Sequence, residues 1–201
     1  MANTQNKFYS SISEYYPEIF PYNPAQLQFV KNNAGDLPGK KVLDIGCATG
    51  ELAFQLSKSG ADVTGIDLNE DLLQQANAKK VHPKLTFQKG NMVELQNDFQ
   101  TETFDTVLCF GNTLVHLPSQ ELISEMLRGV HSVLKPGGLF MLQILNYDYI
   151  LSEPVTELPL IETENIKFVR HYGFDENSPQ ILRSQPLRQF HQSIMNRFTI
   201  A

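Results

Sequence analysis

The sequence predicts an α/β fold built on a parallel sheet, and three observations lead to it. Short apolar runs alternate with segments of helical spacing through the middle of the chain, as in parallel strands joined by helices. The first run, Lys41–Ile45, leads into a glycine loop, as a buried parallel strand does. The chain has 201 residues, 41% hydrophobic and 19% charged, which is the composition of one soluble globular domain.

Strands are expected where apolar runs are bounded by turn residues. The five expected strands of the sheet are Lys41–Ile45, Asp62–Ile66, Leu85–Phe87, Phe104–Cys109 and Leu139–Leu145. After Asn146 the pattern is less regular, and two further strands are expected at Ile166–Phe174 and Ile194–Ile200.

Helices are expected where capping residues and apolar spacing agree. Asn23 is a good N-cap before Pro24, and Gly35 is a suitable stop for that first helix. Further helices are expected from about Glu51 to Ser59, from the cap Asn69 to Lys80, and after the cap Ser119, the last with apolar positions at Ile123, Met126, Leu127, Val130, Val133 and Leu134.

The loop after the first strand is typical of a nucleotide site, because helix N-terminal amides point into such a loop. Its glycines are Gly46 and Gly50, but Ala48 and Glu51 stand where a dinucleotide fingerprint has its second and third glycines. A pyrophosphate needs that close backbone approach, so the loop argues against an NAD site without eliminating it. Asp67, at the end of the second strand, can accept both hydroxyls of a ribose, in an NAD site or an adenosyl site.

Five segments resemble the successive motifs of class I S-adenosylmethionine-dependent methyltransferases. They are VLDIGCATGELA (42–53), GIDLN (65–69), GNMVEL (90–95), FDTVLCFGNTLVHL (104–117) and LKPGGLFMLQ (134–143). The resemblance implies a Rossmann-like, doubly wound, mostly parallel sheet with helices on both faces and a β-rich C-terminal insertion on the acceptor side. It implies a single domain over residues 1–201, with an N-terminal lid and first helix at 1–40, a cofactor-binding core at 41–145 and the insertion at 146–201. The C-terminal hairpin that ordinarily completes the family's sheet is expected to be missing.

The resemblance also implies a set of residues that hold S-adenosyl-L-methionine. Asp44 would order the loop and face the methionine amine, and Asp67 would hold the ribose with Leu68 against the adenine. The implied cofactor-binding residues are Asp44, Gly46, Cys47, Ala48, Gly50, Asp67, Leu68, Asn91, Met92, Phe110 and Gly111.

The acceptor side is expected after the fourth strand. The segment GNTLVHL (111–117) resembles the Gly-Asn-Ser-x-x-His-Leu of small-molecule N-methyltransferases of the glycine and sarcosine type, and NYD (146–148) resembles part of their Arg-Asn-Tyr-Asp. The resemblance implies His116, Asn112 and Tyr147 as catalytic residues. Leu145 stands in place of the family's arginine, which would clamp an amino-acid carboxylate, so Arg170 or Arg183 would have to replace it.

Two of these features have alternative interpretations. His116 is either a base or a residue that orders the loop before Pro118. Tyr9, Tyr15 and Tyr16 either belong to a segment that resembles the family's N-terminal lid or form an aromatic cluster that packs the first helix on the sheet.

Composition narrows the classes of function. Sixteen Lys and Arg against 22 Asp and Glu give a net charge of −6, which argues against nucleic acid as a partner. No apolar run is long enough to span a membrane, nothing resembles a signal peptide, and Cys47 and Cys109 make no disulfide framework, so a cytoplasmic location is expected. The scattered histidines indicate no metal site.

The predicted function is therefore the in-line transfer of a methyl group from S-adenosylmethionine to a nitrogen or oxygen of a small molecule. One alternative is an adenosyl-binding module without catalysis. The other is an NAD(P)-dependent oxidoreductase.

Overall fold

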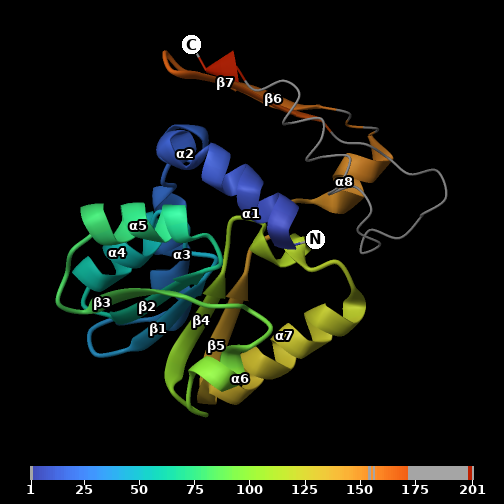
Figure 1. The fold of residues 1–201 in the computed structure, drawn as a ribbon. Coiled ribbons are helices and arrows are strands. Elements are labelled where there is room, and N and C mark those ends of the chain that lie inside the picture. The colour runs from blue at the N-terminus through green and yellow to red at the C-terminus, as the bar shows by residue number, and fades with distance from the viewer. Residues whose placement is uncertain (1, 154, 156, 172–198, 201) are drawn as a thin grey trace. The chain divides into compact units, whose positions relative to one another are not determined.

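The computed structural model describes residues 2–153, 155, 157–171 and 199–200, which divide into two compact units (Figure 1). The core unit consists of residues 22–114 and 121–144. The terminal unit consists of the described residues of 1–21, 115–120 and 145–201.

The core unit is built on a five-stranded parallel sheet with the order β3-β2-β1-β4-β5. Its strands are β1 (Lys41–Ile45), β2 (Asp62–Asp67), β3 (Leu85–Lys89), β4 (Phe104–Cys109) and β5 (Leu134–Leu142). Every strand pair in it is parallel. The predicted parallel α/β sheet is therefore confirmed.

Four helices of the core unit begin and end near the predicted residues: α3 (Pro24–Ala34), α4 (Glu51–Lys58), α5 (Glu70–Lys79) and α7 (Gln120–Val133). A further helix, α6 (Leu95–Asp98), was not predicted. The caps Asn23 and Asn69 are confirmed, because their side chains accept hydrogen bonds from the N–H groups of Ala25 and Leu72. Of the helices in the described residues, none has both the length and the apolar character needed to cross a bilayer.

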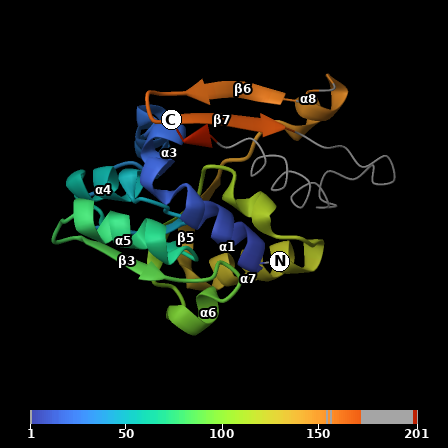
Figure 2. The same ribbon diagram turned by 45° about the horizontal axis from the view of Figure 1, so that its top comes forward.

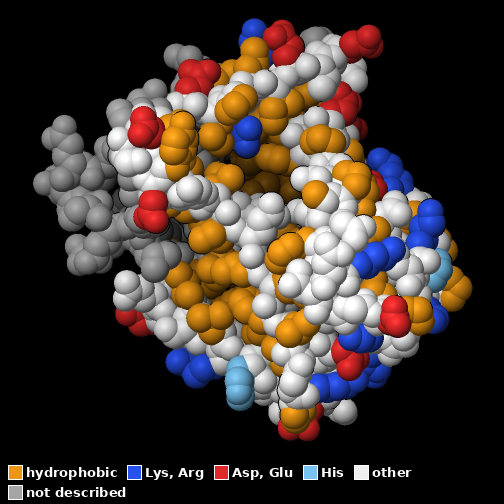
Figure 3. All heavy atoms as spheres, turned by 180° about the vertical axis from the view of Figure 1, so that it is seen from behind, with side chains coloured by type: hydrophobic (Ala, Val, Ile, Leu, Met, Phe, Trp, Pro, Cys, Tyr) orange, Lys and Arg blue, Asp and Glu red, His pale blue; other side chains and the backbone are white. Residues whose placement is uncertain are grey.

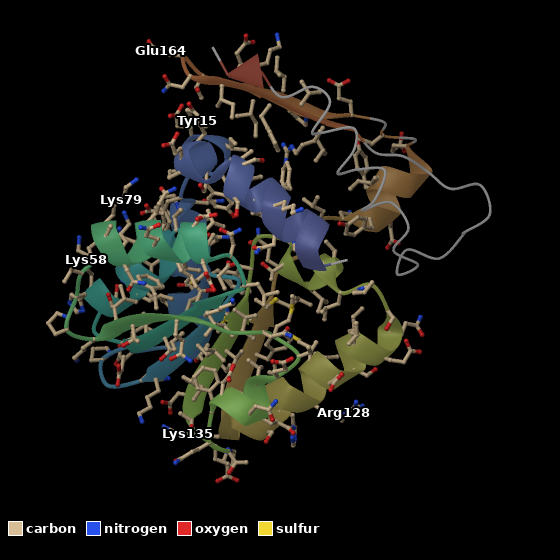
Figure 4. The ribbon with its side chains drawn as sticks, viewed as in Figure 1. Tyr15, Lys58, Lys79, Arg128, Lys135 and Glu164 are labelled. Atoms are coloured by element: carbon tan, nitrogen blue, oxygen red, sulfur yellow. The ribbon has the colours of Figure 1, made fainter. Side chains whose placement is uncertain are left out.

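Charged residues at both ends support α4 and α5. Glu51 and Glu70 lie in the first turns of these two helices, and Lys58 and Lys79, both labelled in Figure 4, lie in their last turns. Each sign of charge opposes the partial charge of the helix end beside it, which stabilises the helix.

One face of the sheet packs on α3, α4 and α5, while α6 and α7 lie on the other (Figures 1 and 2). The first face buries apolar side chains from all three helices and from every strand, among them Val30, Leu56, Leu73, Val42, Val63, Phe87, Leu108 and Met141. This packing holds the strands in place, and the candidate site lies at their carboxyl ends.

The last strand differs from the prediction. The periodicity predicts a helix that includes Leu134 and a strand over Leu139–Leu145, but Leu134 already pairs with Phe104 of β4. The register then shifts before Thr106 pairs with Leu139, and β5 ends at Leu142. Leu134 continues the apolar spacing of α7, so spacing alone cannot separate helix from strand there.

The terminal unit contains a three-stranded antiparallel sheet with the order β6-β7-β8 (Figure 2). Its elements are α1 (Ala2–Ser11), η1 (Ser13–Tyr15), α2 (Tyr16–Ile19), α8 (Tyr147–Ser152), β6 (Glu157–Glu162), β7 (Ile166–His171) and β8 (Thr199–Ile200), while η2 (Thr113–His116) spans the boundary between the units. The predicted strands are confirmed over 166–171 and 199–200, and their remaining residues lie outside the described ones. The expected β-rich C-terminal segment is thus confirmed; it contains an antiparallel hairpin, β6–β7, in a sheet of its own.

The terminal unit has its own apolar core. Phe8, Ile12 and Ile19 from the N-terminal helices pack with Ile166 and Phe168 of β7. The sequence prediction contained neither these helices nor β6, because their apolar residues follow no clear periodicity.

Candidate functional site

The candidate site lies at the carboxyl ends of the parallel strands. The chain winds from β1 through β2 to β3 on one side of β1 and then continues with β4 on the other side. Ligands of doubly wound sheets bind at such a switch point, in the crevice outside the strand ends. The predicted cofactor residues belong to the ends of β1, β2 and β4 or to the loops that follow β1 to β4: Asp44, Gly46, Cys47, Ala48, Gly50, Asp67, Leu68, Asn91, Met92, Phe110 and Gly111.

Two acids give this site its electrostatic character. Asp44 of β1 is only 4% exposed, and Asp67 ends the neighbouring strand. Burial, and then the charge of Asp67, raises the pKa of Asp44 to about 7. Burial also raises the pKa of Asp67, although the N–H groups of Asn69, Ala48 and Leu68 oppose that rise. Two carboxyl groups in a desolvated site favour a ligand that carries positive charge.

The glycine loop has already used its first N–H groups. Gly46 and Cys47 both donate to the carbonyl of Ile66, at 2.8 and 3.0 Å. Ala48 donates to Oδ2 of Asp67 at 2.9 Å. A phosphate-binding loop presents such groups to its ligand, so these three N–H groups are not available to a pyrophosphate.

Two glycines of the loop allow close packing with Thr113, at the start of η2, and with Phe87 of β3. Both have a positive φ, 72° at Gly46 and 77° at Gly50. A Cβ atom on Gly46 would lie 2.5 Å from Cγ2 of Thr113, and one on Gly50 would lie 2.2 Å from the ring of Phe87. Only glycine fits either place without a shift of its neighbour.

The side of the site next to β2 and β3 combines polar and apolar groups. Asp67 accepts through Oδ1 from the N–H of Asn69, and each of its oxygens has a second lone pair for a hydroxyl group. Leu68 is 42% exposed, whereas Met92 is buried. Asn91 accepts through Oδ1 from the N–H of Val93 at 3.3 Å. The donor and acceptor set fits a ribose with an apolar ring beside it.

The loop after β4 is held by residues that sequence reasoning missed. Gly111 and Asn112 both have a φ of 68°. Their N–H groups donate to Gln143, directly after β5: Gly111 to the side-chain Oε1 at 3.3 Å and Asn112 to the backbone oxygen at 3.2 Å. Thr113 donates through Oγ1 to the carbonyl of Phe110 at 2.8 Å. A glutamine directly after an apolar strand was the available sequence signal.

Phe110 itself is a core residue. It is buried with the apolar cluster of the core unit, and its ring meets that of Phe29 on α3 edge to face, with centroids 6.2 Å apart. Any contribution of this residue to a ligand site therefore comes from its backbone.

The two cysteines are buried, unpaired thiols. Burial, and then the charge of Asp44, raises the pKa of Cys109 to about 12. Burial, followed by the charges of Asp67 and Asp44, also raises the pKa of Cys47. Both thiols stay protonated at neutral pH, so neither is an activated nucleophile.

Within the terminal unit, His116 contacts Tyr9. Tyr9 Oη lies 3.0 Å from His116 Nε2, and the two rings meet edge to face with centroids 5.7 Å apart. The Tyr9 ring also contacts the rings of Phe8 and Tyr16. Tyr9, Tyr15 and Tyr16 therefore belong to an aromatic cluster that packs with β7.

The other acceptor-side residues divide between the units. Of the three predicted catalytic residues, Asn112 lies in the core unit, whereas His116 and Tyr147 lie in the terminal unit. Tyr147 begins α8, which Asn146 caps by accepting from the N–H of Tyr149 at 3.1 Å. The guanidinium carbon of Arg170 lies 6.0 Å from the ring centroid of Phe168, and Arg183 lies outside the described residues.

Comparison with known proteins agrees with this geometry. Residues 42–138 match a family model described as a methyltransferase domain. Among curated relatives, the ubiquinone biosynthesis O-methyltransferase of Aliivibrio fischeri (strain MJ11) is 35% identical over 133 residues, which cover 65% of this chain and 55% of the relative. The glycine N-methyltransferase of Rattus norvegicus is 34% identical over 124 residues, which cover 56% and 42%. The chain thus spans about half the length of the curated relatives it matches.

A solved structure confirms the fold. The CcbJ methyltransferase from Streptomyces caelestis superimposes with a TM-score of 0.64 and 24% sequence identity, over 82% of this chain and 68% of that one.

Proposed function

We propose that this chain, whose residues 42–138 match the methyltransferase domain model, transfers a methyl group from S-adenosylmethionine to a nitrogen or oxygen of a small molecule. The observation that carries the proposal is the pair of acids, Asp44 and Asp67, beside a loop whose first three N–H groups, at Gly46, Cys47 and Ala48, already have acceptors. S-adenosylmethionine has a sulfonium and an ammonium group, which such a site stabilises. The pyrophosphate of NAD carries the opposite charge, so the oxidoreductase alternative has the weaker support.

The residues present suit each part of the cofactor. Asp44 would pair with the methionine ammonium, and Asp67 would accept the ribose hydroxyls. The exposed side chain of Leu68 would cover one face of the adenine, with Asn91 and Met92 at its edge. The remaining proposed contacts come from the backbone of two loops, at Gly46, Cys47, Ala48, Gly50, Phe110 and Gly111.

When bound, S-adenosylmethionine supplies a methyl group on positively charged sulfur, which leaves that methyl open to attack by a lone pair in line with the carbon–sulfur bond. The chain's own residues prepare the acceptor. We assign to His116 Nδ1 the removal of the acceptor's proton, with the Nε2–H group donating to Tyr9 Oη and so fixing the plane of the ring. Asn112 and Tyr147 are assigned to orienting the acceptor.

Apolar residues near the end of β5 support an acceptor with an apolar part. Leu142 is 39% exposed and Ile144 is 49% exposed. Figure 3, which views the molecule from behind, shows hydrophobic side chains at several places on that face. Leu145 follows where a carboxylate-binding arginine was expected, so we propose an amine or a hydroxyl compound without an adjacent carboxylate.

The setting of the reaction is part of the proposal. The net charge of −6 supports a small acceptor rather than a nucleic acid. The two unpaired thiols support a location of the protein in the reducing cytoplasm. We also propose that residues 1–201 work as one methyltransferase domain, with 1–40 as a lid and first helix and 146–201 on the acceptor side.

Turnover tests this function directly. The purified chain is incubated with S-adenosylmethionine and a panel of primary amines, secondary amines and phenols, and the S-adenosylhomocysteine formed is measured. We expect turnover with apolar amines or phenols and none with glycine. His116→Gln should abolish turnover while cofactor binding stays, since an amide can still bond to Tyr9 but cannot take a proton. Cofactor binding without turnover on any panel member would support the binding-module alternative instead.

A further inference from the structure

Gln143 makes three hydrogen bonds to the end of β4 and the loop that follows it. Its backbone N–H donates to the carbonyl of Cys109 at 3.0 Å, and its backbone oxygen accepts from the N–H of Asn112 at 3.2 Å. Its side-chain Oε1 accepts from the N–H of Gly111 at 3.3 Å. The first two bonds come from the backbone and do not depend on the side chain. The third depends on the residue being a glutamine.

The same oxygen has a second donor from another element. Gln26 of α3 donates through Nε2 to Oε1 of Gln143 at 2.8 Å, so one acceptor joins α3 to the loop after β4. Gln26 is partly buried, and it lies 117 residues from Gln143 in the chain. The second bond holds the Gln143 side chain in the position from which it can reach Gly111.

The loop needs such hydrogen bonds because two of its residues have backbone angles that are rarely populated. Gly111 and Asn112 are consecutive residues with φ in the left-handed region, which a residue with a side chain such as Asn112 rarely adopts. The last residue of the loop, Thr113, has its side chain in the space over Gly46. Gln143 and Gly46 therefore both limit the conformation of the loop.

We infer that Gln143 is a positioning residue for cofactor binding, which holds the Phe110–Thr113 loop in the conformation that receives the amino-acid end of S-adenosylmethionine. This inference rests on the proposed function, in which Phe110 and Gly111 line that end of the cofactor. It assigns no role to Gln143 toward the adenosine part, because Asp67 and Leu68 belong to the end of β2 and the residue after it.

Two ligands that differ at the amino-acid end distinguish this positioning role from a general loss of cofactor binding. S-adenosylhomocysteine and 5′-methylthioadenosine both have a neutral sulfur and an adenosine, but only the first has the amino-acid group. Gln143→Met keeps the shape of the side chain and removes the acceptor. We expect it to raise the dissociation constant of S-adenosylhomocysteine by about three- to tenfold, the size of one lost hydrogen bond, and that of 5′-methylthioadenosine by less than about twofold.

Two further variants complete the test. Gln26→Met should give the same selectivity with a smaller effect, and it keeps the inference testable if Gln143→Met folds poorly. Gln28→Met is the matched control, because Gln28 lies on the same helix and bonds only within it, to Asn32. Equal losses for both ligands, or no loss for either, would overturn the inference. Failure of the cofactor assignment would be seen separately, since the unaltered chain would then bind neither ligand, and failure of methyl transfer alone would be seen as binding without turnover.

Discussion

Asp44 should make cofactor affinity depend on pH. Burial, and then the charge of Asp67, places its pKa at about 7, so below that pH the empty site holds a proton on Asp44. A positively charged ligand favours the ionised carboxylate. Affinity for S-adenosylmethionine should therefore rise as the pH increases from about 6 to about 8, with proton release on binding at the lower pH. Calorimetric titration in buffers of different ionisation enthalpy measures both quantities.

The control for that titration is 5′-methylthioadenosine, which carries neither the ammonium nor the sulfonium group. Its affinity should change little over the same pH range. An equal pH dependence for both ligands would mean that Asp44 does not face the charged part of the cofactor.

The same carboxyl group, when ionised, lowers the free energy of unfolding of the chain. Its pKa in the folded chain lies above the ordinary value of 3.8 for an aspartate, so the ionised form is disfavoured by folding. The free energy of unfolding should fall as the pH rises from about 4 to about 7 and stay low above that. Asp44→Asn should therefore stabilise the chain by up to roughly 4 kcal/mol at pH 8 and by less at pH 5. Thermal unfolding at both values tests this, and a gain independent of pH would contradict it.

At the scale of elements, the glycine loop and the loop after β4 should depend on each other. Gly46→Ala introduces a Cβ atom 2.5 Å from Thr113 Cγ2 at a positive φ, so it should destabilise the chain by about 1–3 kcal/mol and weaken cofactor binding. Thr113→Ala added to that variant removes the two closest atoms, Cγ2 and Oγ1, but leaves Cβ of residue 113 at 3.1 Å and the strained φ. The double variant should recover part of the lost stability, which chemical denaturation measures. No recovery would mean that the contact is not the cause.

Glu18 should stabilise the terminal unit by joining two of its elements. Its carboxylate accepts from Thr163 Oγ1 at 2.6 Å and from Asn165 Nδ2 at 3.0 Å, which ties α2 to the turn between β6 and β7. Glu18→Ala should cost roughly 1–3 kcal/mol, because these bonds involve a charged acceptor. Hydrogen exchange should become faster in β6 and β7 and remain unchanged in the core unit. The exposed Glu14 offers the control, Glu14→Ala, and equal effects of the two variants would contradict the assignment.

The elements that sequence predicts well are those whose local signals agree. For α3 and α5, a side-chain cap and a clear terminus coincide, and the structure confirms both helices to within about a turn. Local signals conflict at Leu134, which suits the apolar face of α7 as well as a strand, so only its pairing with Phe104 decides. Leu127 fits the same spacing yet is 43% exposed, because spacing does not show where the core ends.

The residues of the candidate site likewise divide into those that the sequence predicts and those that it does not. Asp44, Gly46 and Asp67 are predictable because a strand, a loop and an acid stand in a fixed order along a short segment. Gln26 and Gln143 are not, since their contact depends on two elements far apart in the chain. The contact of Tyr9 with His116 also joins distant segments, and it arises from the packing of helices that have no clear periodicity.

At the scale of the whole molecule, the core unit alone contains every proposed cofactor residue, while His116 and Tyr147 belong to the terminal unit. Cofactor binding therefore depends on proposed residues of the core unit alone. It can be measured without knowing the methyl acceptor.

The most direct measurement is calorimetric titration of the purified chain with S-adenosylmethionine, S-adenosylhomocysteine and NADH in parallel. An acidic site whose loop has already used its first three N–H groups should bind the first two with micromolar affinity and should not bind NADH. Binding of NADH without binding of either adenosyl compound would contradict the central claim and favour the oxidoreductase.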